Sequence, residues 1–195
     1  MKNVIVLLLT FLSFQLVAQD KSIGPTIGYN HAWGTGTGVE SRPGFNAGVI
    51  FNYSFNEHWG LGASLLYSLE GAKVKGIDQT LDLSYVRIPL RAIYYFGDYG
   101  NAFRPKIFLG PSLGFLVGAK QKIGSTNIDL KDNFQSFDLG LLVGAGFNYR
   151  LKDQTWLNVD LGYTNGLLNT STLNSVESQN RLFNLNIGVA FGLNK

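Results

Sequence analysis

Six charged residues stand where apolar residues alternate along the chain with small or polar ones. Three of them are acidic and three are basic: Glu70, Asp138, Asp160, Arg87, Arg91 and Arg150. A charge buried inside a protein is costly unless an opposite charge meets it. We therefore expect Arg87 and Arg91 to pair with the three carboxylates and to form a polar plug. A gated path for ions or protons is the alternative use of such a cluster.

The patterns that resemble catalytic or ligand-binding motifs lack part of what their chemistry needs. Residues 110–114 have the G-x-S-x-G spacing of hydrolases around Ser112, but that nucleophile needs a sharp turn from a strand into a helix, and no helix follows. The two histidines, His31 and His58, belong to no spaced set of metal ligands. The glycine-rich segment 34–38 lacks the Lys-Ser/Thr pair of a phosphate-binding loop and is typical of a flexible outer loop. We therefore expect no catalytic residue, no metal site and no cofactor.

An alternation with a period of two residues runs through most of the chain. From Phe137 to Tyr149 every second residue is apolar or aromatic, and most residues between them are small or polar. Successive side chains of a strand point to opposite faces, so this pattern predicts strands with one apolar face. Pro89 cannot donate to a strand ladder, and we expect a bulge or local widening there. About eight strands are predicted, at residues 23–30, 45–55, 59–70, 86–96, 107–118, 137–150, 157–164 and 183–193.

The composition favours strands that face something other than water. Hydrophobic residues make up 45% of the chain and charged residues only 15%, whereas soluble domains carry about 25% charged residues. After the first twenty residues, no apolar run has the roughly 18 residues that a membrane helix needs. The formal net charge of +3, without a dense Lys/Arg run, argues against nucleic acid as a partner. The absence of cysteine excludes disulfides and thiolate metal sites.

The N-terminal segment has the layout of a secretory signal peptide. Lys2 is positively charged, an apolar run from Val4 to Leu12 follows, and the small Ala18 precedes polar residues. The apolar run is shorter than a membrane-spanning helix requires. We expect residues 1–18 to be a cleaved signal peptide and residues 19–195 to form one outer-membrane β-barrel domain.

Short turns alternate with long polar loops along the chain, as in bacterial outer-membrane barrels. Two further features place the apolar face of the predicted strands on the outside of the barrel. The polar face carries mostly Gly, Asn and Ser, which suit a narrow interior. Aromatic residues, which prefer the headgroup level of a membrane, gather next to the short turns: Tyr53, Phe55, Trp59, Tyr94, Phe96, Phe147, Tyr149 and Phe191. The expected fold is an all-β, transmembrane, antiparallel up-and-down barrel of about eight strands in the cell outer membrane. A soluble lipocalin-like binding barrel with its apolar face inside is the alternative.

One predicted strand carries a resemblance to a known family. Residues 85–90, Tyr-Val-Arg-Ile-Pro-Leu, followed by Tyr-Tyr-Phe at 94–96, resemble a strand of the PorT-like outer-membrane β-barrel family. Arg87 stands where that family often has Glu, and Ile93 stands where it often has Lys. The resemblance implies an outer-membrane protein of the Bacteroidota type, and some members of that family are linked to protein secretion and gliding machinery.

The last predicted strand is similar to the signal that the barrel-assembly machinery reads. Asn186, Gly188, Phe191 and Leu193 have its spacing of a polar residue, a glycine and two apolar residues. Two further residues follow, where many barrels end on an aromatic residue. This similarity implies that the machinery is a partner during biogenesis.

We expect a non-enzymatic barrel with a structural, scaffold or secretion-associated role. Its partners would be outer-membrane lipid, the assembly machinery, and proteins of the envelope or of a secretion complex. The alternatives are a narrow porin-like channel for small solutes and a barrel enzyme that acts on lipid through His31 or Ser112. Side chains just fill the interior of an eight-stranded barrel, which favours the non-enzymatic, closed form.

Overall fold

A computed structural model of the chain describes residues 20–34, 39–74, 79–124, 126–172 and 179–193. The predicted signal peptide, residues 1–18, lies outside these described residues, as do residues 35–38 of the glycine-rich segment and residues 173–178 of the loop before the last strand. Among the residues that are described, no helix is long and apolar enough to cross a membrane.

The described chain consists almost entirely of β-strands. One short 3-10 turn, η1 (Lys131–Asn133), lies between two of them. The strands follow each other as β1 (Asp20–Gly34), β2 (Val39–Ser54), β3 (Trp59–Val74), β4 (Gln79–Tyr95), β5 (Phe103–Ile123), β6 (Thr126–Asp129), β7 (Phe137–Lys152), β8 (Thr155–Gly166) and β9 (Asn180–Gly192).

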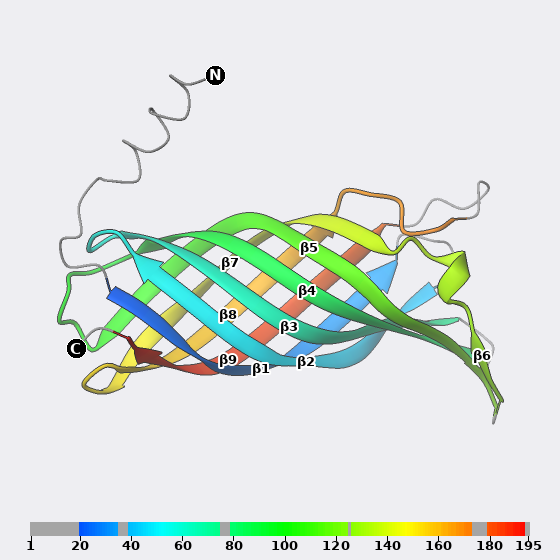
Figure 1. The fold of residues 1–195 in the computed structure, drawn as a ribbon, viewed down its shortest axis with the longest axis horizontal. Helices are drawn as coiled ribbons and strands as arrows, with labels where there is room; N and C mark the ends of the chain where they lie inside the picture. The colour runs from blue at the N-terminus through cyan, green and yellow to red at the C-terminus, as the bar shows by residue number, and fades with distance from the viewer. Residues whose placement is uncertain (1–19, 35–38, 75–78, 125, 173–178, 194–195) are drawn as a thin grey trace, which may run out of the picture.

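The eight long strands close into an antiparallel barrel (Figure 1). Successive strands pair along the chain, and β9 returns to pair with β1. The short strand β6 pairs with β5 as a hairpin, so β7 is the neighbour of β5 in the wall. The predicted all-β, closed, eight-stranded antiparallel barrel is therefore confirmed. Closure removes the free edges of the sheet and satisfies the backbone groups within the wall.

The outer face of the wall is apolar and the inner face is polar. Ile27 on β1 and Leu109 on β5 are 67% and 60% exposed, whereas the inward Thr26 and Ser112 on the same strands are 4% and 2% exposed. A soluble lipocalin-like barrel would have its apolar face inside, so that alternative is wrong.

Aromatic rings form bands toward both ends of the outer face. At the end with the short turns, the ring centroids of Trp59 and Tyr94 lie 5.0 Å apart, and those of Phe103 and Phe147 lie 5.1 Å apart. A second band toward the opposite end includes Phe115 and its neighbour on β7. The sequence pattern predicts only the first band. β5 continues past Phe115 to Ile123, so the aromatic residues of the second band do not mark the end of this strand in the sequence. Two such bands are typical of a membrane barrel.

The sequence predicts a bulge or a local widening at Pro89. There is no bulge at this residue, but the pairing of β4 with β3 is interrupted there, between the pairs Ala63–Leu90 and Leu66–Arg87. The register of β4 against β5 is the same on both sides of this residue, with Pro89 opposite Ser112 and Ala92 opposite Leu109. The register instead shifts between Ser84 and Tyr85. A proline removes one hydrogen-bond donor from the ladder, but this loss does not require an extra residue in either strand.

The two ends of the barrel differ in their connections. β1 begins and β9 ends at the end where short turns join β2 to β3 and β7 to β8 (Figure 1, left). At the other end, the β5–β6 hairpin projects beyond the wall (Figure 1, right). There the segment before β7 is tied to the loop after β8 by backbone hydrogen bonds, from Gln135 N to Thr170 O at 2.9 Å and from Thr172 N to Asn133 O at 3.2 Å. We call these two ends the short-turn end and the loop end.

Candidate functional site

Among the described residues, seven charged side chains are buried inside the barrel. Arg104 lies near the short-turn end. The other six, three of each sign, form two groups: Glu70, Asp138 and Asp160 with Arg87, Arg91 and Lys106, each at most 6% exposed. The strands position them because the period of two residues points every second side chain inward. Five of the six residues of the predicted charge cluster are therefore brought together. Lys106 takes the place of Arg150.

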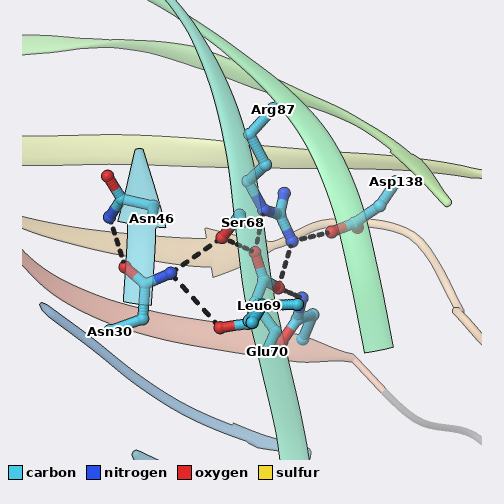
Figure 2. Close-up of polar contacts among 8 residues, drawn as sticks. Asn30, Asn46, Ser68, Leu69, Glu70, Arg87 and Asp138 are labelled. Atoms are coloured by element: carbon cyan, nitrogen blue, oxygen red, sulfur yellow. Dashed lines mark hydrogen bonds and ion pairs between the residues drawn. The ribbon is translucent and has the colours of Figure 1, made fainter. Parts of the chain in front are cut away.

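Arg87 is at the centre of the first group of charges (Figure 2). Its Nε and Nη2 donate to the two carboxylate oxygens of Glu70, the latter at 2.7 Å, and Nη2 also donates to Asp138 at 2.8 Å. Glu70 accepts further hydrogen bonds from Ser68 at 2.8 Å and from Asn180 at 2.6 Å. This bidentate geometry is the strongest form of an arginine–carboxylate pair.

Neutral side chains extend this group across the interior (Figure 2). Nδ2 of Asn30 donates to Oγ of Ser68 at 2.8 Å, and Nδ2 of Asn46 donates to Oδ1 of Asn30 at 2.7 Å. The chain of hydrogen bonds thus runs from β2 through β1 and β3 to the charged group. Such a network holds the facing strands at a defined spacing.

Asp160 is at the centre of the second group. Arg91 and Lys106 each place a nitrogen near one of its oxygens, at 2.9 Å and 2.8 Å. Lys106 also donates to Asn148 at 2.7 Å, and Arg91 donates to Ser64 at 3.2 Å. One carboxylate faces two cations here, whereas in the first group one cation faces two carboxylates. The two groups together are electrically neutral.

Two glycines make room for these ion pairs. Gly114 on β5 is the register partner of both Arg87 on β4 and Asp138 on β7. A Cβ atom at Gly114 would lie 2.8 Å from Nη1 of Arg87 and 3.3 Å from Cβ of Asp138. The guanidinium group therefore uses the space that a side chain on β5 would fill.

The same arrangement occurs one strand further around the wall. Gly146 on β7 is the register partner of both Lys106 on β5 and Asp160 on β8. A Cβ atom at Gly146 would lie 2.5 Å from a carboxylate oxygen of Asp160. The sequence offers a signal for Lys106, because it precedes Phe108 by two residues and therefore shares its inward face.

Arg150 does not belong to either group. It lies near the short-turn end, where its Nη2 donates to the backbone oxygen of Gly100 at 2.8 Å. Its alternation on β7 is inward, but it stands four residues beyond Gly146 and so lies at a different level of the barrel. The two-residue period predicts on which face of a strand a residue lies, but it does not predict the level of that residue, which is its height along the barrel axis.

The middle of the interior is nearly full. A cavity of about 30 Å³ lies between the two charged groups, which is room for about one water molecule. Larger cavities of about 340 Å³ and 540 Å³ lie at the short-turn end and the loop end. An apolar cluster fills more of the interior, with Ile93, Tyr95, Phe108 and Leu142. The interior can hold charges in fixed positions, and the described residues leave no wide passage at its centre.

The other sequence motifs lie in places that do not suit their chemistry. Ser112 is buried inside the β5 ladder, opposite Pro89 and Gly140, so it lies on no sharp strand-to-helix turn. His31 lies on β1 with Nδ1 3.4 Å from the hydroxyl of Tyr29. No described hydrogen bond joins Ser112 to a histidine or a carboxylate, and the partner of His31 is a tyrosine hydroxyl.

His58 lies in the turn between β2 and β3. Its Nδ1 is 3.2 Å from the backbone oxygen of Tyr95. One possible ligand atom from each of Glu57, His58 and Asp98 lies within 4.8 Å of the others, so these three side chains could approach a metal ion together. The sequence does not predict this group, because Asp98 belongs to a different turn.

Three of the four residues of the predicted assembly signal lie on β9, and Leu193 directly follows its last residue, Gly192. Gly188 is inward and buried, whereas Phe191 and Leu193 are outward and 49% and 54% exposed. Asn186 is inward, opposite Gly28 on β1. β9 is the strand that closes the barrel against β1, and the role of these residues in assembly stays a prediction.

Comparison with known families decides the class of this barrel. Residues 17–172 match the family described as outer membrane protein beta-barrel domain. The chain belongs to this family. As a family member it is a small β-barrel protein of the bacterial outer membrane, so its apolar outer face contacts lipid. The short-turn end is then the periplasmic end and the loop end is the extracellular end.

Solved structures of other small outer-membrane barrels share the fold. OprG of Pseudomonas aeruginosa has a TM-score of 0.59 at 18% identity, with 91% of this chain and 97% of that one covered. Neisserial surface protein A has 0.56 at 21% identity, with 87% and 96% covered. The attachment invasion locus protein Ail of Yersinia pestis has 0.52 at 16% identity, with 89% and 99% covered. No curated protein matches the chain.

Proposed function

We propose that this outer-membrane barrel conducts no solutes, catalyses no reaction and has a structural, scaffold or secretion-associated role. The observation that carries the proposal is the neutral plug of three cations and three carboxylates, which leaves a central cavity of about 30 Å³. Each charge of the plug has an opposite partner, so no charge of the plug is available to a passing ion. A channel would have to break at least one of these pairs.

Protein partners would meet the barrel at its extracellular end. The β5–β6 hairpin projects beyond the wall, and the four residues of β6 are all exposed. The resemblance of residues 85–96 to the PorT-like family supports a Bacteroidota-type protein whose partners belong to the envelope or to a secretion complex. Export through a signal peptide at residues 1–18 and insertion by the barrel-assembly machinery belong to the same proposal.

Conductance in planar lipid bilayers tests the closed interior. We expect no discrete current steps from the mature protein, provided that the same preparation shows the boiling-dependent gel mobility of a folded barrel. A narrow channel is the second candidate, and the cavities of about 340 Å³ and 540 Å³ at the two ends are the observation that favours it. Regular current steps in the folded, unsubstituted protein would support that channel and contradict the proposal.

A genetic test addresses the absence of catalysis. Loss of the gene should increase the sensitivity of the envelope to detergent if the barrel has a structural role. The double variant Ser112→Ala/His31→Ala removes the two candidate catalytic side chains and should restore resistance as well as the unsubstituted gene does. Failure of this folded variant to restore resistance would favour an enzyme.

A further inference from the structure

The cavity at the periplasmic end has the properties of a ligand site. It has a volume of about 340 Å³, within the range of small-molecule sites. Hydroxyl, amide and aromatic side chains line it, including Ser22, Asn52, Ser54, Tyr95 and Trp156. Such a lining suits a polar ring, because hydroxyl and amide groups can bond its substituents while the aromatic rings cover its faces.

Arg104 lines this cavity as a buried cation. Its side chain is 5% exposed, and its guanidinium carbon lies 4.7 Å and 5.1 Å from the ring centroids of Tyr95 and Tyr99. One Nη atom donates to the backbone oxygen of Glu57. Its Nε is buried and has no hydrogen-bond partner among the described residues. A buried donor without an acceptor is costly, so an acceptor from a ligand would stabilise this group.

Arg150 adds a second guanidinium group to the same cavity. It donates to the backbone oxygen of Gly100 at 2.8 Å and lies 5.9 Å from the ring centroid of Trp156. Within the described part of the chain, neither Arg104 nor Arg150 has a carboxylate within 4.0 Å. Asp153 is the one carboxylate among the lining residues.

The charge of the cavity differs from that of the plug. In the plug, three cations face three carboxylates, whereas here Arg104 and Arg150 face Asp153 alone. Lys21 adds a third cation to the lining, and its ammonium group lies 5.8 Å from the ring centroid of Tyr53. The cavity therefore carries an excess positive charge that an anion could neutralise.

We propose that this cavity binds a water-soluble periplasmic molecule that carries an oxyanion, a phosphate or a carboxylate, on a sugar-like ring. Guanidinium groups match the planar, bidentate geometry of oxyanions, and neither Arg104 nor Arg150 is already paired with a carboxylate among the described residues. A soluble molecule is favoured over a lipid headgroup because the inward-facing Asn52 and Ser54 line the cavity, inside the wall rather than on its lipid-facing surface. This binding site goes beyond the structural role proposed above.

Titration calorimetry on the mature protein in an uncharged polyoxyethylene detergent tests the proposal. The probes are glucose 6-phosphate and glucuronate, which combine a ring with an oxyanion, and glucose, which has the ring alone. Saturable binding of either acid, with glucose at least about tenfold weaker, is the expected result. No binding of either acid at millimolar concentration, or equal binding of glucose, would overturn the proposal. The acid that binds more tightly distinguishes a phosphate from a carboxylate ligand.

Two variants and one matched control locate the binding. Arg104→Gln and Arg150→Gln should each weaken the binding of the acid by about tenfold or more, because each removes a charged donor. Lys152→Gln removes the same charge two residues further along β7, from an exposed side chain that does not line the cavity, and should change the affinity by less than about twofold. An equal effect of Lys152→Gln, or no effect of Arg150→Gln, contradicts the site. Arg150 is only partly buried, so this variant remains informative if Arg104→Gln fails to fold.

Discussion

Arg87 on β4 and Asp138 on β7 form an ion pair of 2.8 Å although β5 lies between their strands. Gly114 on β5 is opposite both residues, so the side chain of Arg87 passes over a position that has no Cβ atom. Lys106 reaches Asp160 in the same way over a glycine of β7. A cation, a glycine and a carboxylate on three successive strands are thus the unit from which the plug is built.

Substitution of the central glycine should break this unit. In Gly114→Val the new side chain meets Arg87, so we expect the free energy of unfolding to fall by about 1–3 kcal/mol. Gly118→Val on the same strand is the control, because the nearest atom to its Cβ would be 3.8 Å away, on Ser84. Urea unfolding in lipid vesicles measures both variants. Equal losses would show that any side chain on β5 is harmful and that the space for Arg87 is unimportant.

Removal of Arg87 should be far more costly than removal of a cation at the rim. Arg87→Ala leaves two buried carboxylates facing each other, and we expect a loss of roughly 3–5 kcal/mol in the free energy of unfolding. Arg42 also pairs with a carboxylate, that of Asp82, but both side chains are about 30% exposed, so Arg42→Ala should cost about 1 kcal/mol or less. The temperature at which the band of the folded protein disappears from a gel ranks the two variants by stability. Unchanged heat stability of Arg87→Ala would argue against a plug.

Substitutions of Asp160 and Lys106 in the second group should differ in how much they lower the free energy of unfolding. Asp160→Asn leaves Arg91 and Lys106 without their shared carboxylate, and we expect a loss of about 3–5 kcal/mol. Lys106→Met keeps the pair of Arg91 with Asp160 and fills a similar volume, so its loss should be smaller. The same urea transitions measure both variants. A larger loss in Lys106→Met would mean that Asp160 is not the centre of the group.

A charged side chain on the lipid-facing surface should lower stability more at the middle of the membrane than outside it. Ile187 is outward on β9, midway between the aromatic residues Phe183 and Phe191. Ile187→Arg should therefore reduce the free energy of folding in lipid by about 2–4 kcal/mol. Ile128 is similarly exposed but lies on the β5–β6 hairpin, so Ile128→Arg should have little effect. Folding yield in vesicles compares the two, and equal costs would place the hairpin in the membrane as well.

The assembly signal on β9 predicts a kinetic defect. Phe191→Ala should slow insertion into the outer membrane several-fold, as the fraction of heat-modifiable protein after a short labelling pulse would show. Leu185→Ala removes an outward apolar side chain from the same strand outside the signal and serves as the control. If both variants insert at the same rate, Phe191 contributes only lipid contact.

The amino-acid sequence by itself determines the local geometry of this protein. The period of two residues predicts the strands, and it also assigns Arg87 and Asp160 to the same inner face. The aromatic residues next to the short turns indicate which face meets lipid. These properties depend on near neighbours in the chain, which is why they can be predicted without a structure.

The tertiary structure decides which inward residues meet. The stagger between strands sets the level of each residue, and it brings Lys106 to Asp160 while it places Arg150 near the periplasmic end. The register shift beside Tyr85 and the second aromatic band depend on the same stagger. Closure of the barrel fixes this stagger through the pairing of all eight strands at once, so no single segment of sequence contains it.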